Sequence, residues 1–157
     1  MGRLLSRQQS IAETLKARDV FSKAQILTED EGDLFSLVQQ AAAKTDGLTL
    51  LVMLHSGKNG ARSTMGPSFE PQLTISIFKP LAVSDVHLLD VVELVLACLH
   101  NFHPQGANGP LEHDATPFDT GPSMPGFVIK NVHFHCAYKA QTKADLASNL
   151  INQPKGP

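Results

Sequence analysis

Residues 48–55 read Leu-Thr-Leu-Leu-Val-Met-Leu-His, a short and nearly unbroken apolar run between Gly47 and Gly57. A strand with one wet face alternates between apolar and polar residues, and this run does not. Near-continuous apolar strands are typical of positions inside a sheet that is covered on both faces. We therefore predict a central strand at 48–55, around which the rest of the chain must build a sheet.

Patterns elsewhere predict three more strands and three helices. Residues 72–78 alternate between inward Leu and Ile and outward Gln, Thr and Ser, which predicts a half-buried strand in a hairpin with the central strand. Thr28 and Glu31 form a candidate capping box at the start of an amphipathic helix. Gly47 stands where a glycine commonly ends a helix. In chain order we expect a helix at 5–17, a strand at 19–27, a helix from 28 to 47, strands at 48–55 and 72–78, a helix at 84–103 and a strand at 127–139.

The order α-β-α-β-β-α-β predicts an α+β fold, a two-layer sandwich with helices packed on one four-stranded, mostly antiparallel sheet. The 157 residues fit one domain. We place this domain at 1–140 and expect 141–157 to form a partly mobile C-terminal tail. Residues 56–70 and 104–126 are rich in Gly and Pro, which predicts two long loops.

Composition narrows the function classes. Only 18% of the residues are charged, and a surface short of charge often has patches that a partner covers. The net charge of −2 and the lack of a basic run argue against electrostatic nucleic-acid binding. No apolar run approaches the roughly 20 residues of a membrane-spanning helix, so we expect no membrane. Cys98 and Cys136 have the apolar neighbours of small buried side chains, and a disulfide between them stays an alternative.

Histidine pairs are the candidate metal ligands. His100 and His103 are three residues apart, and His133 and His135 are two apart. A catalytic zinc needs three such ligands and an open position. Exposure on the polar face of a strand explains the second pair, and a helix C-terminus suits His100. We therefore predict no metal and no catalytic residue, and keep a small metal-dependent enzyme as a minor alternative.

Two other patterns fail on spacing. With Gly32 as the sixth residue of a calcium loop, Leu27 stands first and Val38 twelfth, where Asp and Glu are needed, so helix capping explains the acids of 29–33 better. Residues 56–60, Ser-Gly-Lys-Asn-Gly, lack both the leading glycine and the Ser or Thr of a phosphate-binding loop. We accordingly predict no cofactor.

Several local strings and the order of elements resemble the tail terminator (tail-completion) proteins of long-tailed bacteriophages. The resembling stretch runs from about Val20 to Tyr138. It holds, in order, the string Leu27 to Leu34 before a helix, Ser56-Gly57-Lys58-Asn59 at the end of a strand, Leu99-His100 at the end of a helix, a Gly109-Pro110-Leu111 loop and a final alternating strand.

The resemblance implies a structural virion protein and not an enzyme. Proteins of this family form a homo-oligomeric ring, commonly of six copies, on the last disc of the tail tube. The ring stops tube growth, meets the head–tail connector protein and leaves a passage for DNA without sequence-specific contact. Assembly in the host cytoplasm and residence in the tail or neck of the virion follow, and another neck or head–tail joining protein is the alternative. The expected contacts with other copies or the tube are Lys58, Arg62, Phe69, Leu111, His113 and Phe118.

Overall fold

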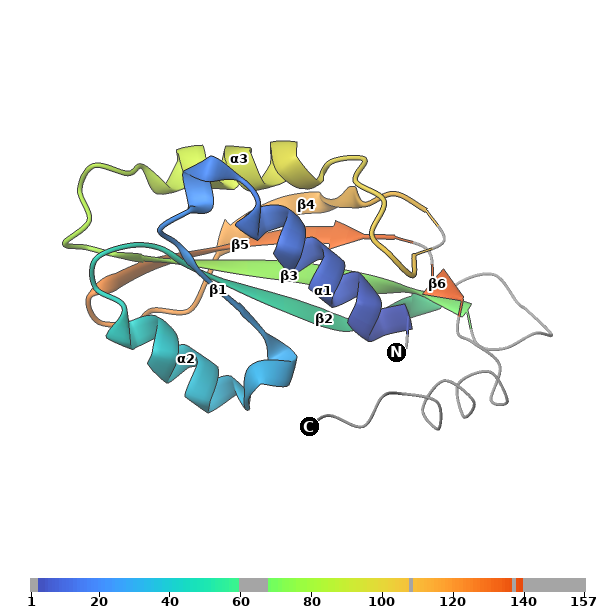
Figure 1. Ribbon diagram of the computed structural model, residues 1–157, viewed down its shortest axis with the longest axis horizontal. Helices are drawn as coiled ribbons and strands as arrows, with labels where there is room; N and C mark the ends of the chain where they lie inside the picture. The colour runs from blue at the N-terminus through green and yellow to red at the C-terminus, as the bar shows by residue number, and fades with distance from the viewer. Residues whose placement is uncertain (1–2, 60–67, 108, 137, 140–157) are drawn as a thin grey trace.

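A computed structural model describes residues 3–59, 68–107, 109–136 and 138–139 (Figure 1). The predicted tail at 141–157 lies outside the described residues. The elements are α1 (Arg3–Lys16), the 3-10 turn η1 (Asp19–Phe21), β1 (Gln25–Thr28), the 3-10 turn η2 (Glu29–Glu31), α2 (Leu34–Ala43), β2 (Thr49–Asn59), β3 (Ser68–Pro80), α3 (Leu88–Leu99), β4 (Glu112–Thr120), β5 (Phe127–His135) and β6 (Tyr138–Lys139).

These strands form one mixed sheet. Its main path is β1-β2-β3-β5-β4, and the two-residue β6 pairs with the start of β3. β1 and β2 are parallel, with α2 as the crossover between them, and the other pairs are antiparallel. The α+β class and the β2–β3 hairpin are thus confirmed, but the main path has five strands where four were predicted.

α1 and α3 cover one face of this sheet (Figure 1). Alternate residues of the central strands point to this face and are almost fully buried: Leu50, Val52, Leu73, Ile75, Ile77, Val132 and Phe134. The helices add Ile11 and Leu15 from α1 and Val91, Val92, Val95 and Leu99 from α3. Because burying one such side chain stabilises the fold by about 1.5–3 kcal/mol, this face holds the main core.

α2 covers part of the opposite face, where Leu37 and Ala41 pack against Leu27, Leu51, Phe78 and Ile129. Helices therefore lie on both faces, and the predicted two-layer arrangement is wrong. The central strand explains why. Leu50, Leu51 and Val52 are each at most 1% exposed, so consecutive residues, which point to opposite faces, all need cover. The predicted burial of this strand on both faces is confirmed.

Local hydrogen bonds set helix boundaries that differ from the predicted ones. The capping box of Thr28 and Glu31 forms, but it closes η2 and not the following helix. α2 begins after Asp33, whose carboxylate accepts a hydrogen bond from the Ser36 N–H (2.7 Å). That bond holds the pKa of Asp33 below its ordinary value. α3 begins only after His87, later than predicted, and ends at Leu99.

Strand β4 lies where the loop 104–126 was predicted. Its side chains are exposed or half-buried, so it lacks the apolar alternation from which a strand is recognised. Pairing with β5 forms it, through Glu112 and His113 and again from Phe118 to Thr120, with an irregular stretch between. The other predicted loop, 56–70, is also shorter than expected. β2 extends to Asn59, and β3 begins at Ser68.

Where β1 ends, side chains form hydrogen bonds with the backbone groups at the edge of β2. β1 pairs with β2 only from Thr49 to Val52. The Gln8 amide donates to the Val52 carbonyl oxygen (3.2 Å) and to the Glu29 carboxylate (3.1 Å). Glu29 also accepts a hydrogen bond from the Leu54 N–H. Together with the caps, these contacts show that the acids of 29–33 serve local structure.

Candidate interaction surfaces

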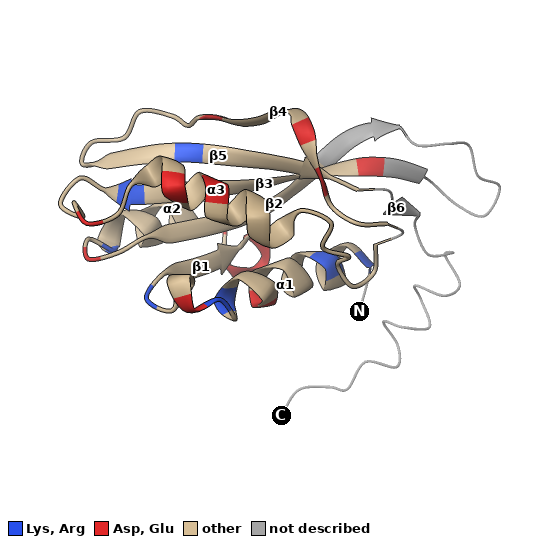
Figure 2. Ribbon diagram, turned by 90° about the horizontal axis from the view of Figure 1, so that it is seen from above, with Lys and Arg blue, Asp and Glu red and all other residues tan. Residues whose placement is uncertain are grey.

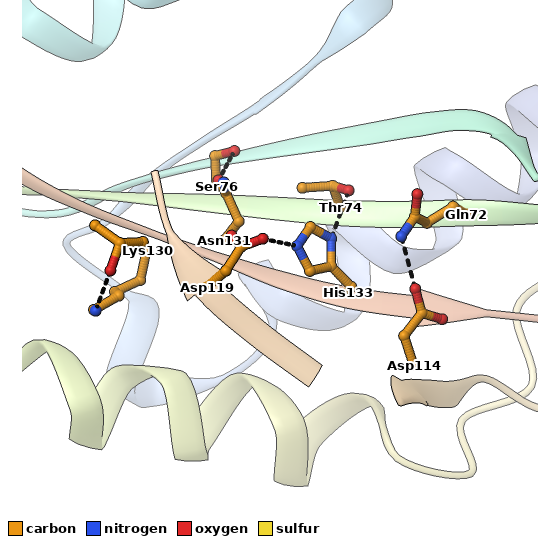
Figure 3. A network of polar contacts seen from close by, with 9 residues as sticks. Gln72, Thr74, Ser76, Asp114, Asp119, Lys130, Asn131 and His133 are labelled. Atoms are coloured by element: carbon orange, nitrogen blue, oxygen red, sulfur yellow. Dashed lines mark hydrogen bonds and ion pairs between the residues drawn. The ribbon is translucent and has the colours of Figure 1, made fainter. Parts of the chain in front are cut away.

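The sheet face that α2 leaves open carries a ladder of polar side chains from β3, β5 and β4 (Figure 3). Thr74 Oγ1 lies 3.0 Å from His133 Nδ1, and His133 Nε2 lies 3.0 Å from an Asp119 carboxylate oxygen. Ser76 donates to Asn131 (2.7 Å). Thr74 and Ser76 are buried, although the alternation predicted them at the surface. Each contact joins neighbouring strands, so the ladder holds β3, β5 and β4 together.

A second part of the ladder holds the start of β4. Gln72 donates to one oxygen of Asp114 (2.7 Å), and the other oxygen lies 2.7 Å from His135 Nδ1. His135 Nε2 lies 3.4 Å from Glu112, so its ring sits between two carboxylates of β4. Because backbone pairing of β4 with β5 is interrupted after His113, these side chains secure a strand that the backbone alone holds only at its ends.

Between the ladder and α2 lies a hollow of about 540 Å³. Its lining combines apolar side chains, including Leu34, Val38 and Met53, with Thr74 and Ser76 of the ladder. Leu34 and the neighbouring Phe35 are 61% and 72% exposed. Since the polar groups of the lining already bond one another, the hollow offers mainly apolar contact, which suits a protein surface better than a reacting small molecule.

The histidines do not converge on one point. His133 and His135 are held by carboxylates of β4 and are not simply exposed, as the sequence suggested. The His100 and His113 rings lie 6.2 Å apart, and His103 contacts the backbone of its own loop. Within the described ranges, no group of three or more His, Cys, Asp or Glu is arranged to hold a metal ion.

The cysteines belong to the interior, and both are free thiols. Cys136 is buried and Cys98 half-buried. Burial raises the pKa of the Cys136 thiol, while the Arg7 guanidinium acts in the opposite direction. A protonated thiol is a poor nucleophile, so the geometry gives Cys136 a packing role. Arg7 is itself completely buried on α1, which helix periodicity did not indicate because arginine is expected at the surface.

The six predicted contact residues differ in their location and exposure. Phe118, which is 40% exposed, and His113 are at the surface of β4. Leu111 is completely buried in the main core, so its prediction as an interface residue is wrong. Lys58 and Phe69 lie in the β2–β3 hairpin, where the structure describes only the backbone, and Arg62 lies outside the described residues.

Charge is distributed unevenly over the fold (Figure 2). Residues 85–120, which include α3 and β4, hold six acids and no Lys or Arg. Residues 3–24, which include α1 and η1, hold five Lys or Arg and two acids. α1 packs on β1 and β2, at the end of the strand order opposite to β4. η2 adds Glu29, Asp30 and Glu31 beside α1, and Arg7 is buried, so α1 and η1 do not form a basic side. The fold has an acidic side, α3 and β4.

Comparison with known proteins informs on the fold. No family model and no curated protein sequence matches the chain. Fourteen solved chains match it in structure. One of them, which has no descriptive name, superposes with a TM-score of 0.54 and 10% sequence identity over 87% of this chain and 92% of its own length. Likeness at that identity supports a shared fold alone. No helix in the described part of the chain has the length and apolarity to span a bilayer.

Proposed function

We propose that this protein is a ring-forming virion subunit, a tail terminator that caps the phage tail tube and meets the head–tail connector protein. The virion setting comes from the resemblance of the local strings, which also sets the expected number of copies at six. The observation that carries the proposal is the exposed apolar patch of Leu34 and Phe35 beside the hollow at α2, which suits a covered interface.

A ring needs two different surfaces on each copy, which fit each other through a rotation that closes. The acidic side, α3 and β4, is one candidate for such a surface. A two-fold dimer brings one patch against its own copy, so like charges disfavour a two-fold contact through the acidic side. Contact of the acidic side with a different surface of the next copy is the arrangement that the charges favour.

The hollow beside α2 is left for a different partner. It opens on the sheet face that α1 and α3 do not cover, and Leu34 and Phe35 expose apolar surface beside it. Single exposed apolar residues are ordinary, but two neighbours next to an apolar hollow form a patch that suits a covered interface. In the proposed assembly this patch contacts the tail tube protein or the connector protein.

Light scattering and negative-stain imaging test the ring. We expect a discrete ring-shaped particle that dissociates with added salt, since exposed charges are screened beyond about 10 Å at 0.1 M salt. Asp90→Asn with Glu93→Gln removes two exposed charges from α3 on the acidic side and leaves the carboxylates that hold His133 and His135 in place. This double variant should weaken each contact by roughly 0.2–1 kcal/mol per lost ion pair.

Glu13→Gln with Asp19→Asn is the matched control, because it removes the same charge from α1 and η1, outside the acidic side. It should leave the association unchanged. Equal weakening by both double variants would rule out the acidic side as the contact. A chain that stays monomeric at every concentration and neither binds tail tubes nor stops their growth would contradict the proposed function as a whole.

A further inference from the structure

The imidazole of His135 lies between two carboxylates that β4 supplies. Its Nδ1 lies 2.7 Å from an Asp114 carboxylate oxygen, and its Nε2 lies 3.4 Å from a Glu112 carboxylate oxygen. A carboxylate accepts hydrogen bonds and donates none, whereas a neutral imidazole has one N–H and one lone pair. A neutral His135 therefore turns a lone pair toward one of the two carboxylates in either tautomer. Only the imidazolium, which has two N–H groups, is attracted to both.

His133, on the same face of β5, does not have this need. Its Nε2 lies 3.0 Å from an Asp119 carboxylate oxygen, but its Nδ1 lies 3.0 Å from the Thr74 hydroxyl. A hydroxyl both donates and accepts, so Thr74 can donate to the Nδ1 lone pair while the Nε2–H donates to Asp119. The neutral form thus satisfies both nitrogens of His133. The two histidines differ in how many protons their surroundings need.

Other ionisable side chains also surround His135. Among the described residues they are His133 and Cys136 of β5, Glu70 of β3, His55 of β2 and Arg7 of α1. Arg7 and Glu70 act with opposite signs on Cys136, which points to the other face of β5. α2, the helix on the His135 face of the sheet, contains no charged residue. The charges in contact with the imidazole are therefore the two carboxylates of β4.

Asp114 lies where β4 leaves the backbone ladder. Pairing of β4 with β5 is interrupted after His113 and resumes at Phe118. Beside this gap, the second oxygen of Asp114 accepts a hydrogen bond from Gln72 of β3 (2.7 Å; Figure 3). The side chains of His135 and Asp114 are 30% and 22% exposed, so solvent screens their contact only in part. A positive imidazole at His135 therefore fastens the unpaired stretch of β4 to the sheet.

We propose that His135 is a proton-dependent clamp on β4. As the imidazolium it holds Asp114 and Glu112 and closes the start of β4 on the sheet, and loss of one imidazole proton loosens this stretch. Histidine ordinarily loses that proton near about pH 6.5, and carboxylates take one up only near about pH 4. The unfolded chain does not hold the two carboxylates beside the imidazole. The clamp therefore stabilises the fold at about pH 6, and its contribution falls as the pH rises toward about 8.

Nitrogen-15 NMR of the histidine side chains, recorded on the wild type across this pH range, counts the protons on each imidazole. We expect His135 to keep both protons to a higher pH than His133. Loss of the second proton from His135 at the same pH as from His133, or at a lower pH, overturns the proposal. The clamp acts within one subunit, so this result is independent of whether the protein assembles into rings.

Urea unfolding at low protein concentration, at about pH 6 and about pH 8, measures what the clamp contributes. His135→Gln keeps a hydrogen-bond donor but cannot take up the proton, and His133→Gln is the matched control on the same strand. Between the two pH values, the unfolding equilibrium constant of the wild type should rise roughly 2- to 20-fold more than that of His135→Gln, as expected for two partly exposed ion pairs. His133→Gln should keep most of the wild-type pH dependence. Equal pH dependence in the wild type and His135→Gln overturns the clamp.

Discussion

Replacing Leu111 with alanine tests whether the segment between α3 and β4 belongs to the core of its own subunit. Leu111 is completely buried, and its N–H donates to the Phe102 carbonyl oxygen (2.7 Å). Leucine-to-alanine changes at such sites cost about 2–5 kcal/mol, because the cavity left behind adds to the lost transfer energy. Each kcal/mol shifts Tm by about 2–4 °C in a domain of this size, so we expect Tm to fall by about 4–20 °C.

Leu89→Ala is the matched control. It deletes the same atoms from α3, where 57% of the side chain is exposed. Full burial of leucine is worth about 1.5–3 kcal/mol, so burial of less than half should cost about 1 kcal/mol or less. Urea unfolding at low protein concentration and high salt measures both variants without a contribution from assembly. Equal losses of stability, or loss of rings by Leu111→Ala with its stability intact, would refute the assignment of Leu111 to the core.

Three further changes probe the interior and a helix cap. Gln8→Ala leaves a β2 carbonyl without its side-chain donor and should cost about 1–3 kcal/mol in urea unfolding, with Gln9→Ala as the milder control. Asp33→Asn keeps a capping acceptor but removes a carboxylate whose folded pKa is lowered. The carboxylate therefore stabilises the wild type above its unfolded pKa, and urea midpoints of the two chains should converge as the pH falls below about 4. A colorimetric thiol reagent at neutral pH should leave Cys136 unmodified in the folded chain, react slowly with Cys98 and reach both after unfolding; rapid reaction of both would contradict the burial.

The elements predicted from sequence are those whose side chains carry a strong pattern. The apolar run at 48–55 predicted β2, and the alternation at 72–78 predicted β3 and its hairpin. β4 was missed because an edge strand with exposed side chains has no apolar period to detect. The helix expected at 84–103 begins only after His87. Ser84 has a side chain that can cap a helix, but the helix does not begin there.

The candidate surfaces were harder to predict than the strands. Phe118 and His113 were placed at the surface correctly as residues of a segment rich in Pro and Gly, and Leu111 of the same segment was not. The difference depends on α3, against whose end the chain folds back, and no local pattern reports that contact. The ladder of Thr74 and His133 was also missed, because each partner alone is an ordinary polar residue on a strand.

The amino-acid sequence alone determined which apolar runs must be buried, and with them the α+β class and the central hairpin, but it did not indicate the burial of Arg7 or Leu111. Tertiary structure decided which strands are neighbours, that helices cover both faces, and that the acidic segments α3 and β4 belong to one side of the molecule. The physical reason is the range of the interactions. Burial follows from apolar side chains that are a few residues apart in the sequence. Strand order depends on hydrogen bonds between backbone segments that are far apart in the chain. Because the backbone is alike at every residue, the sequence does not show which segments will pair.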